Sequence, residues 1–249
     1  DGWDDIVVVG GARDLLATAA KEYFPTLGRG GIMALVGPIE RGTPIELELG
    51  TYHYDDTLMV GTTSCDIDAA YKANTDFTIR KGSTVVYFGA GGPMGQTGIL
   101  WAASLGDDAP GRIIATDIQS QRLACVEALA SYLPPATRFE TVNTSEIPVE
   151  SCFSGGQIDY LVVLAPAVEA FHEYLPFMAD NSIVNLFAGM RHKYAAIDAY
   201  DIAARGLRLV GHSGDDIASQ KRCLDKILLG RIVTNPVVAA VGGMDAGYD

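Results

Sequence analysis

Long apolar runs, an excess of basic residues and clustered metal ligands are all missing from this sequence. No run reaches the roughly 18 apolar residues that a membrane-spanning helix needs. Acidic residues outnumber basic ones by 31 to 18, and the net charge of −13 would repel nucleic-acid phosphates. The chain begins with acidic residues and without Met, whereas a secretory signal begins with basic ones. We therefore expect a cytoplasmic protein, cut or processed at its start, with neither a membrane nor a nucleic acid as partner.

Cysteine and histidine are too few and too scattered to predict a metal site. The cysteines show no C-x-x-C pair, which excludes the spacing of paired zinc ligands. We expect all four to be reduced and mostly buried thiols: Cys65, Cys125, Cys152 and Cys223. The four histidines form no H-x-x-x-H cluster, and we expect His53 and His172 to be ordinary surface or core residues. The sequence therefore predicts no zinc ligand and no catalytic acid.

The sequence does contain a regular alternation of buried strands and helical stripes. After Lys81, apolar runs predict strands at 84–88, 112–116, 138–142, 160–165, 183–188 and 207–210. Apolar stripes at helical spacing follow several of them, the first made of Met94, Gly98, Trp101 and Leu105. The stripe after the fourth strand ends at Met178. Strands that alternate with helices, without hairpin signals, predict an α/β fold with a doubly wound parallel sheet, the Rossmann fold.

A glycine-rich segment, 89–95, joins the first of these strands to its helix. Glycines permit a tight turn and let backbone N–H groups approach a pyrophosphate, and the start of the helix adds unpaired donors and a positive dipole. The segment departs from G-x-G-x-x-G because Gly95 falls one position later than that pattern requires. We expect it to bind the phosphates of a dinucleotide. The alternative is an ordinary turn in which glycine serves packing alone.

Asp117 ends the second strand, 22 residues after Gly95. Its carboxylate can accept hydrogen bonds from the adenine-ribose hydroxyls and would repel a 2′-phosphate, which favours NAD over NADP. The alternative is an acidic residue of a solvated loop without a ligand. Arg122 tempers this preference, because a guanidinium could hold that phosphate. A nicotinamide would pass the loops after the fourth, fifth and sixth strands. The residues expected to bind the cofactor are Gly89, Gly91, Gly92, Pro93, Met94, Gly95, Asp117, Ile118, Arg122, Ala165, Pro166 and Gly189.

The first 72 residues look like the second half of the same unit. The run at Asp5 precedes a matching run at Asp159 by 154 positions, and the runs at Ile32 and Met59 precede theirs by 151 and 150. Three blocks in one order at nearly one offset indicate a repeat, although buried strands resemble one another in any case. We expect 1–76 to be the second half of a Rossmann unit, 77–218 a complete NAD-binding unit, and 219–249 an exit helix leading back to a missing catalytic domain.

In these features the chain resembles the coenzyme domain of the medium-chain dehydrogenases, and most of all the branch of sorbitol- and sorbose-phosphate-dehydrogenase-like proteins. The segments that carry the resemblance are 81–86, 89–96, 117–118, 122–123 and 230–232. It covers 78 to about 235 as one unit and 4–68 as the latter half of another. The resemblance implies an NAD(P)-binding segment of an oxidoreductase that acts on an alcohol, polyol or sugar phosphate. The GroES-like catalytic domain of that family, with its zinc, has no counterpart here, so we expect the segment alone to be inactive.

The resemblance also implies a strand pairing and leaves other functions open. Two subunits of such dehydrogenases usually pair through their sixth strands, so we expect 58–62 to lie antiparallel to 207–211 within this chain, or two chains to form a homodimer. A non-catalytic NAD-binding or dimerisation module is the alternative function. A methyltransferase that uses S-adenosylmethionine has a related sheet, but the glycines next to the helix and the lack of an antiparallel seventh strand disfavour it.

Overall fold

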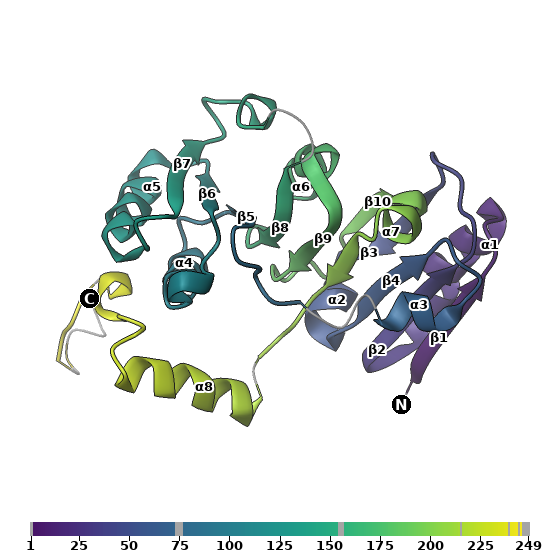
Figure 1. Cartoon of the computed structure of the whole chain (residues 1–249), viewed down its shortest axis with the longest axis horizontal. Helices are drawn as coiled ribbons and strands as arrows, with labels where there is room; N and C mark the ends of the chain where they lie inside the picture. The colour runs from purple at the N-terminus through teal and green to yellow at the C-terminus, as the bar shows by residue number, and fades with distance from the viewer. Residues whose placement is uncertain are drawn as a thin grey trace.

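The protein is built around one large sheet (Figure 1). The structure, a computed structural model, describes residues 2–72, 77–153, 157–214, 216–238, 240–243 and 245. Nine strands lie in the order β1-β2-β4-β11-β9-β8-β5-β6-β7, and β3 and β10 pair in a small second sheet. The strands are β1 (Trp3–Val9), β2 (Leu27–Val36), β3 (Pro44–Glu48), β4 (Leu58–Thr62), β5 (Thr84–Phe88), β6 (Arg112–Asp117), β7 (Arg138–Asn143), β8 (Ile158–Val163), β9 (Met178–Leu186), β10 (Tyr194–Asp198) and β11 (Arg208–Val210).

Helices cover both faces of the large sheet. The α-helices are α1 (Arg13–Thr18), α2 (Leu49–Asp55), α3 (Ile67–Lys72), α4 (Pro93–Ala103), α5 (Ser120–Glu127), α6 (Val168–Tyr174), α7 (Ala199–Ala204) and α8 (Ile217–Leu228). On one face, α4 and α5 bury apolar side chains against β5, β6 and β8. On the other face, α1, α2, α6 and α7 contribute to the largest apolar core. The predicted α/β fold with a doubly wound sheet is confirmed.

The six strands predicted after Lys81 agree with the observed ones to within two residues at each end, except at the start of β9. Neighbouring strands in the order β7-β6-β5-β8-β9-β11 are all parallel. β9 begins at Met178, which the sequence assigned to the preceding helix, and the predicted start at Ile183 was wrong. Pro176 explains the difference, because it lacks an N–H group and lies in a 3₁₀ turn, Leu175–Phe177, that follows the end of α6.

α4 is present as predicted, but its apolar stripe does not face the core. The residues of α4 that are buried are Gly95, Ile99, Leu100 and Ala102. Met94 is 51% exposed, and together with Gly98 and Trp101 it lines a pocket between α4 and the segment that follows β11. α4 is apolar on more than one side, so the spacing of its apolar residues could not identify the buried face.

The predicted pairing between the sixth strands is confirmed within the chain. β4 and β11 are antiparallel, with Leu209 opposite Met59 and Val210 opposite Leu58. β4 is parallel to β2 on its other side, and β11 is parallel to β9. Two parallel sets of strands therefore join at one antiparallel junction and form a continuous sheet. A homodimer of the chain stays a prediction.

A second link across this junction was not predicted from the sequence. β3 and β10 pair antiparallel, with Glu46 opposite Ala196. Each end of the ladder is closed by a carboxylate that caps a helix, because Glu48 accepts from the N–H of Thr51 and Asp198 from that of Tyr200. The same carboxylates accept N–H groups from across the junction: Glu48 from His192, and Asp198 from Gly42 and Thr43. Such short strands become recognisable only once their partner, 150 residues away, is known.

Local conformation recurs at the offset seen in the sequence. Three non-glycine residues of the described chain have a positive φ, and each has a positive-φ glycine 150 or 151 positions away. The pairs are Gly30 and Asn181, Gly42 and His192, and Asp56 and Gly206. Left-handed backbone is rare outside glycine, so three matched positions are strong evidence of equivalent turns. The division at 76 and 218 stays a prediction.

Asp56 joins the turn before β4 to the end of β11. Its carboxylate accepts hydrogen bonds from the N–H of Ser213 (2.9 Å) and from Arg29 Nε (2.7 Å), and His212 Nδ1 lies 3.1 Å away. Burial by itself raises the pKa of the Asp56 carboxyl, but the contacts with Ser213, Arg29 and His212 outweigh it, and the pKa is lowered. The ionised carboxylate is therefore the form that the fold stabilises.

We expect this carboxylate to make stability depend on pH in the acid range. Because the pKa of folded Asp56 lies below the unfolded value of about 4, its contribution is complete above that pH and is lost as the pH falls through the folded value. At pH 7, Asp56→Asn should be less stable than the wild type by up to about 1 kcal/mol, since Asn tolerates left-handed backbone. Urea unfolding of both proteins from pH 7 to pH 3 measures the difference in their free energies of unfolding, which should become smaller as the pH falls. A difference that does not change with pH would contradict this role of Asp56.

The cysteines were predicted to be mostly buried, and this is wrong. All four are free, but Cys65 and Cys125 are exposed and Cys152 and Cys223 are only half-buried. Cys125 lies on α5 between Leu123 and Val126, which are the residues that face the core, so it points to solvent. Within the described residues, no helix is both long and apolar enough to cross a membrane, and no cluster of metal-ligating side chains occurs.

Candidate functional site

The glycine segment forms the turn between β5 and α4, as predicted. Gly89 has a φ of +82°, which an L-residue adopts only with strain, and an added Cβ would lie 2.7 Å from the Cβ of Ala165. The N–H groups of Gly89 and Ala90 donate to the carbonyl of Thr116 at 2.9 and 2.8 Å. These two bonds hold the turn against the carboxyl end of β6.

Three later glycines of this turn are in different surroundings. A Cβ on Gly91 would lie 2.6 Å from Asp117 Oδ2, and a Cβ on Gly95 would lie 2.3 Å from the carbonyl oxygen of Ala90. Gly91 and Gly95 are therefore required by packing. A Cβ on Gly92 would meet nothing within 4 Å, so the space in front of Gly92 is open. This opening lies where the turn becomes α4 and is free for a ligand.

The first turn of α4 provides backbone donors beside this opening. Gly92 is the N-cap, and Pro93 is the first helical residue. Pro93 has no N–H to lose, so its ring starts the helix without an unpaired donor. Met94 and Gly95 follow, and the N–H groups of a first helical turn have no acceptor within the helix. Together with the helix dipole, they favour an anion at this point.

Asp117 is buried at the end of β6 and is bonded to the glycine turn. It is 8% exposed, and its Oδ2 accepts the N–H of Gly91 at 2.9 Å while Oδ1 accepts that of Gln119 at 3.0 Å. Each carboxylate oxygen can accept a further hydrogen bond. The sequence predicted a ribose contact for Asp117 but missed this bond to Gly91. Asp117 thus fixes the turn and also presents acceptors to the space beside it.

Seven of the twelve predicted cofactor residues line one cavity of about 320 Å³ at the carboxyl ends of β5, β6 and β8. They are Gly89, Gly92, Asp117, Ile118, Arg122, Ala165 and Pro166. Phe88, Gln119, Thr144, Leu164 and Ala167 complete the lining. Ile118 is 66% exposed, which is unusual for an isoleucine and leaves an apolar surface beside the Asp117 carboxylate. The cavity combines a carboxylate, a guanidinium and an apolar surface at the edge where ligands of parallel α/β sheets bind.

The other predicted residues lie outside this lining. Gly91 and Gly95 are buried in the turn, and Pro93 is exposed on α4. Met94 lines a neighbouring pocket, and Gly189 lies against Tyr54. Their contact with a cofactor stays a prediction.

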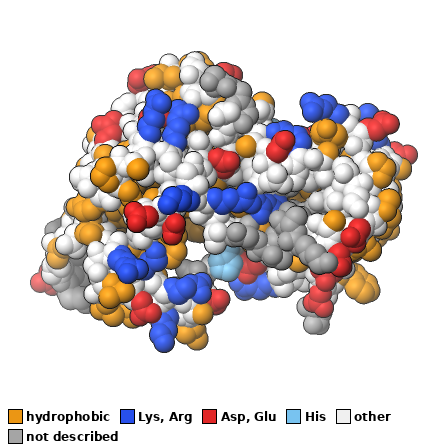
Figure 2. All heavy atoms as spheres, in the orientation of Figure 1, with side chains coloured by type: hydrophobic (Ala, Val, Ile, Leu, Met, Phe, Trp, Pro, Cys, Tyr) orange, Lys and Arg blue, Asp and Glu red, His pale blue; other side chains and the backbone are white. Residues whose placement is uncertain are grey.

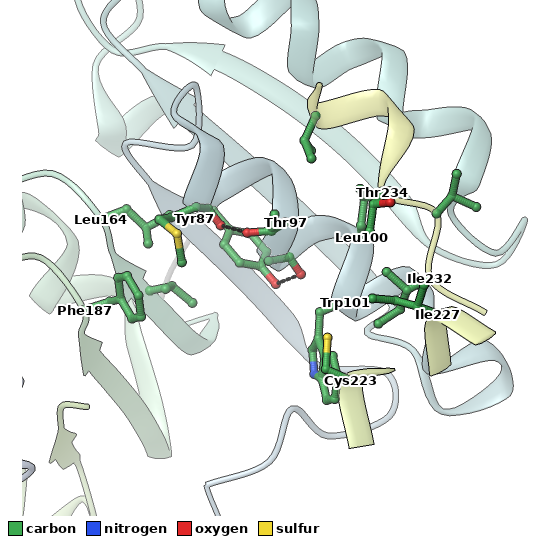
Figure 3. Close-up of a pocket in the computed structure, with 15 residues that line it drawn as sticks. Tyr87, Thr97, Leu100, Trp101, Leu164, Phe187, Cys223, Ile227, Ile232 and Thr234 are labelled. Atoms are coloured by element: carbon green, nitrogen blue, oxygen red, sulfur yellow. Dashed lines mark hydrogen bonds between the residues drawn. The ribbon is translucent and has the colours of Figure 1, made fainter. Parts of the chain in front are cut away.

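The neighbouring pocket has a volume of about 340 Å³ and an apolar lining (Figure 3). Leu164 belongs to both cavities, so the two adjoin at this residue, directly after β8. Figure 3 shows Leu164 and Phe187 on one side of Tyr87, with Trp101 of α4 and Cys223 of α8 on the other side. The hydroxyl of Tyr87 donates to the carbonyl of Gly98, so the Tyr87 ring lines the pocket without leaving its polar group unpaired.

The face seen in Figure 1 carries charges of both signs. Figure 2 shows acidic and basic side chains intermixed across the described part of this face. Arg122 is the basic side chain in the lining of the 320 Å³ cavity. A phosphate there would therefore depend on backbone donors as much as on side-chain charge.

The chain is similar to two longer curated proteins, and no protein-family model matches it. It is 24% identical over 246 residues to mannitol-1-phosphate 5-dehydrogenase of Aliivibrio fischeri, covering 92% of this chain and 58% of that protein. It is 28% identical over 203 residues to YggP of Escherichia coli K12, covering 73% of this chain and 47% of that protein. The chain thus spans about half the length of the relatives it matches.

Solved structures give the fold. A zinc-binding dehydrogenase of Sinorhizobium meliloti 1021 bound to NADP superimposes with a TM-score of 0.51 and 22% identity, covering 62% of this chain and 44% of that one. Glucose dehydrogenase of Haloferax mediterranei gives 0.50 and 13%, covering 68% and 46%. The chain shares its fold with part of these dehydrogenases. The resemblance to dehydrogenase coenzyme domains that the sequence predicted is confirmed at the level of the fold.

Proposed function

We propose that this chain is the dinucleotide-binding part of an oxidoreductase. The observation that carries the proposal is the cavity at the carboxyl ends of β5, β6 and β8, which brings the open face of Gly92 together with Asp117. Two phosphates would lie in front of Gly92, where the first N–H groups of α4 and the helix dipole stabilise negative charge. The adenine ribose would then reach Asp117, and the adenine would pack on Ile118.

NAD is the expected cofactor, with NADP the weaker ligand. Ribose hydroxyls can donate to the free lone pairs of Asp117, whereas a 2′-phosphate would lie beside a buried carboxylate. Arg122 lines the same cavity and offers the only cationic side chain in its described lining. It reduces the cost of a 2′-phosphate without removing the repulsion from Asp117.

The residues of this chain bind and orient rather than react. When bound, a nicotinamide supplies the hydride chemistry. We expect Ala165, Pro166 and Gly189 to hold its end of the molecule at the loops after β8 and β9. The substrate would be an alcohol, a polyol or a sugar phosphate, which the similarity to a mannitol-1-phosphate dehydrogenase supports. The proposed division assigns binding to 77–218, and proton transfer to a domain outside this chain.

A non-catalytic module that binds NAD is the second candidate. The chain spans only about half the length of these relatives, so turnover is tested on the full-length protein. Oxidation of polyols or their phosphates with reduction of NAD would favour the enzyme. Tight NAD binding without turnover across such a panel would favour the module.

Titration calorimetry of this chain with NAD and with NADP tests the proposal directly. We expect one saturable site per chain and tighter binding of NAD. ADP-ribose should compete with NAD, because it carries the same diphosphate and adenosine. No binding of either dinucleotide would refute the proposal.

A further inference from the structure

Two helices at equivalent positions differ in the residues they present to the opposite unit. α2 precedes β4 and α7 precedes β11, and the chain positions of these elements differ by 150. Both helices pack closely on a glycine: a Cβ on Gly211 would lie 2.7 Å from the backbone N of His53, and a Cβ on Gly61 would lie 2.9 Å from the Cα of Ala203. His53 and Tyr54 of α2 thus correspond to Ala203 and Ala204 of α7.

The antiparallel junction places the end of α2 at the same edge of the sheet as the carboxyl end of β11. Because β4 runs opposite to β11, the start of β4 lies beside the carboxyl end of β11, with Leu58 opposite Val210. α2 ends three residues before β4, so His53 and Tyr54 lie at the edge of the sheet where β8, β9 and β11 also end. The proposed dinucleotide site lies along this same edge.

Both aromatic residues contact the loop that follows β9. The ring of His53 lies edge-on to that of Phe187, with centroids 5.7 Å apart. The hydroxyl of Tyr54 lies 2.5 Å from where a Cβ on Gly189 would be, so this hydroxyl packs against one side of Gly189, which is otherwise exposed. The guanidinium of Arg191 lies 4.3 Å over the ring of Tyr54. Three residues of the 187–191 loop therefore contact the pair from α2.

His53 has a polar atom without a described partner. Its Nδ1 is buried and makes no hydrogen bond within the described residues. Burial lowers the pKa of His53, Asp56 raises it and His212 lowers it, and the net direction is down. The imidazole is therefore neutral at neutral pH and able to accept or donate one hydrogen bond.

We infer that His53 and Tyr54 of the first unit position the 187–191 loop for the nicotinamide half of the dinucleotide. The inference rests on the proposed dinucleotide site and adds a contribution from the opposite unit. The cavity in front of Gly92 shares Leu164 with the pocket lined by Phe187, and the ring of His53 contacts Phe187. At the equivalent positions of α7, Ala203 packs on Gly61 of the first unit and Ala204 is exposed, so no aromatic pair is present there.

The test compares two ligands that differ only in the nicotinamide. Calorimetry measures NAD and ADP-ribose on the wild type and on a His53→Ala/Tyr54→Ala double variant, which copies the residues of α7. We expect NAD affinity to fall by about tenfold and ADP-ribose affinity to change less than about twofold. Tyr54→Phe keeps the ring under Arg191 and should retain most of the NAD affinity.

Each outcome bears on the inference separately from the proposed function. The inference is supported if the double variant loses affinity for NAD alone and Tyr54→Phe keeps most of its NAD affinity. Equal losses for both ligands would mean that the pair only holds the fold together, and unchanged affinities would mean that it does not act on the loop. Either result overturns the inference and leaves the dinucleotide site intact. A wild type that binds neither ligand overturns both.

Discussion

We expect Gly92→Asp to lose dinucleotide binding by about a thousandfold while the protein stays folded. A Cβ at this position meets nothing within 4 Å, so the backbone of the free protein can accept a side chain here. The added carboxylate would lie where the phosphates are proposed to bind. Two like charges about 4 Å apart, at an effective dielectric constant of about 20, repel by about 4 kcal/mol, which is about a thousandfold in affinity.

The neighbouring variants separate size from charge. Gly92→Asn has nearly the shape of Gly92→Asp without its charge, and Gly92→Ala adds one methyl group. We expect NAD to bind most tightly to Gly92→Ala, less tightly to Gly92→Asn and least tightly to Gly92→Asp. All three should stay folded, with Gly92→Ala the least stable, because position 92 is the N-cap of α4 and Asn and Asp are the better caps. Gly91→Ala would instead bring a Cβ to 2.6 Å from Asp117 Oδ2 and destabilise the turn itself. Full NAD affinity in Gly92→Asp would contradict the assignment of this turn to the phosphates.

The second large effect is expected in the choice between NAD and NADP. Asp117→Asn removes the charge that would face a 2′-phosphate, and we expect the ratio of NADP to NAD affinity to rise by about a hundredfold. Asn has only one acceptor oxygen, so the N–H of either Gly91 or Gln119 loses its partner. We expect a loss of stability of about 1 kcal/mol, which lowers Tm by about 2–4 °C for a chain of this size.

Calorimetry with both cofactors measures this ratio, and thermal unfolding measures the loss of stability. Arg122→Ala is the matched control, because it removes the cationic group of the same cavity and keeps the Cβ that lies beside Gly91 of the turn. It should weaken NADP more than NAD. A ratio that does not change in Asp117→Asn would mean that the carboxylate serves only to hold Gly91.

The sequence predicted those parts of the fold that depend on neighbouring residues. The strand 84–88 and the glycine turn after it were placed correctly, because continuous apolar runs and glycine both act locally. The pairing of β4 with β11 joins distant residues, and it was predicted from the resemblance to dehydrogenases whose subunits pair through their sixth strands, together with the need of an apolar edge for a partner.

Contacts between distant residues could not be predicted in the same way. The β3–β10 ladder joins two five-residue strands whose patterns are too short to identify a partner. The bond between Asp117 and the N–H of Gly91 depends on the shape of the turn, which no spacing reveals. His53 was taken for an ordinary residue because a lone histidine carries no pattern. Its proximity to Phe187 exists only once the two units have paired.

The junction between β4 and β11 also has a consequence for how the molecule can diverge. When two identical subunits pair, every change appears on both sides of the symmetry axis, and the partners must find each other by diffusion. Here the partners are tethered, so their effective concentration is fixed by the chain and does not fall on dilution. Tethering also frees each half to change alone. One half can give up its own ligand and specialise in supporting its neighbour.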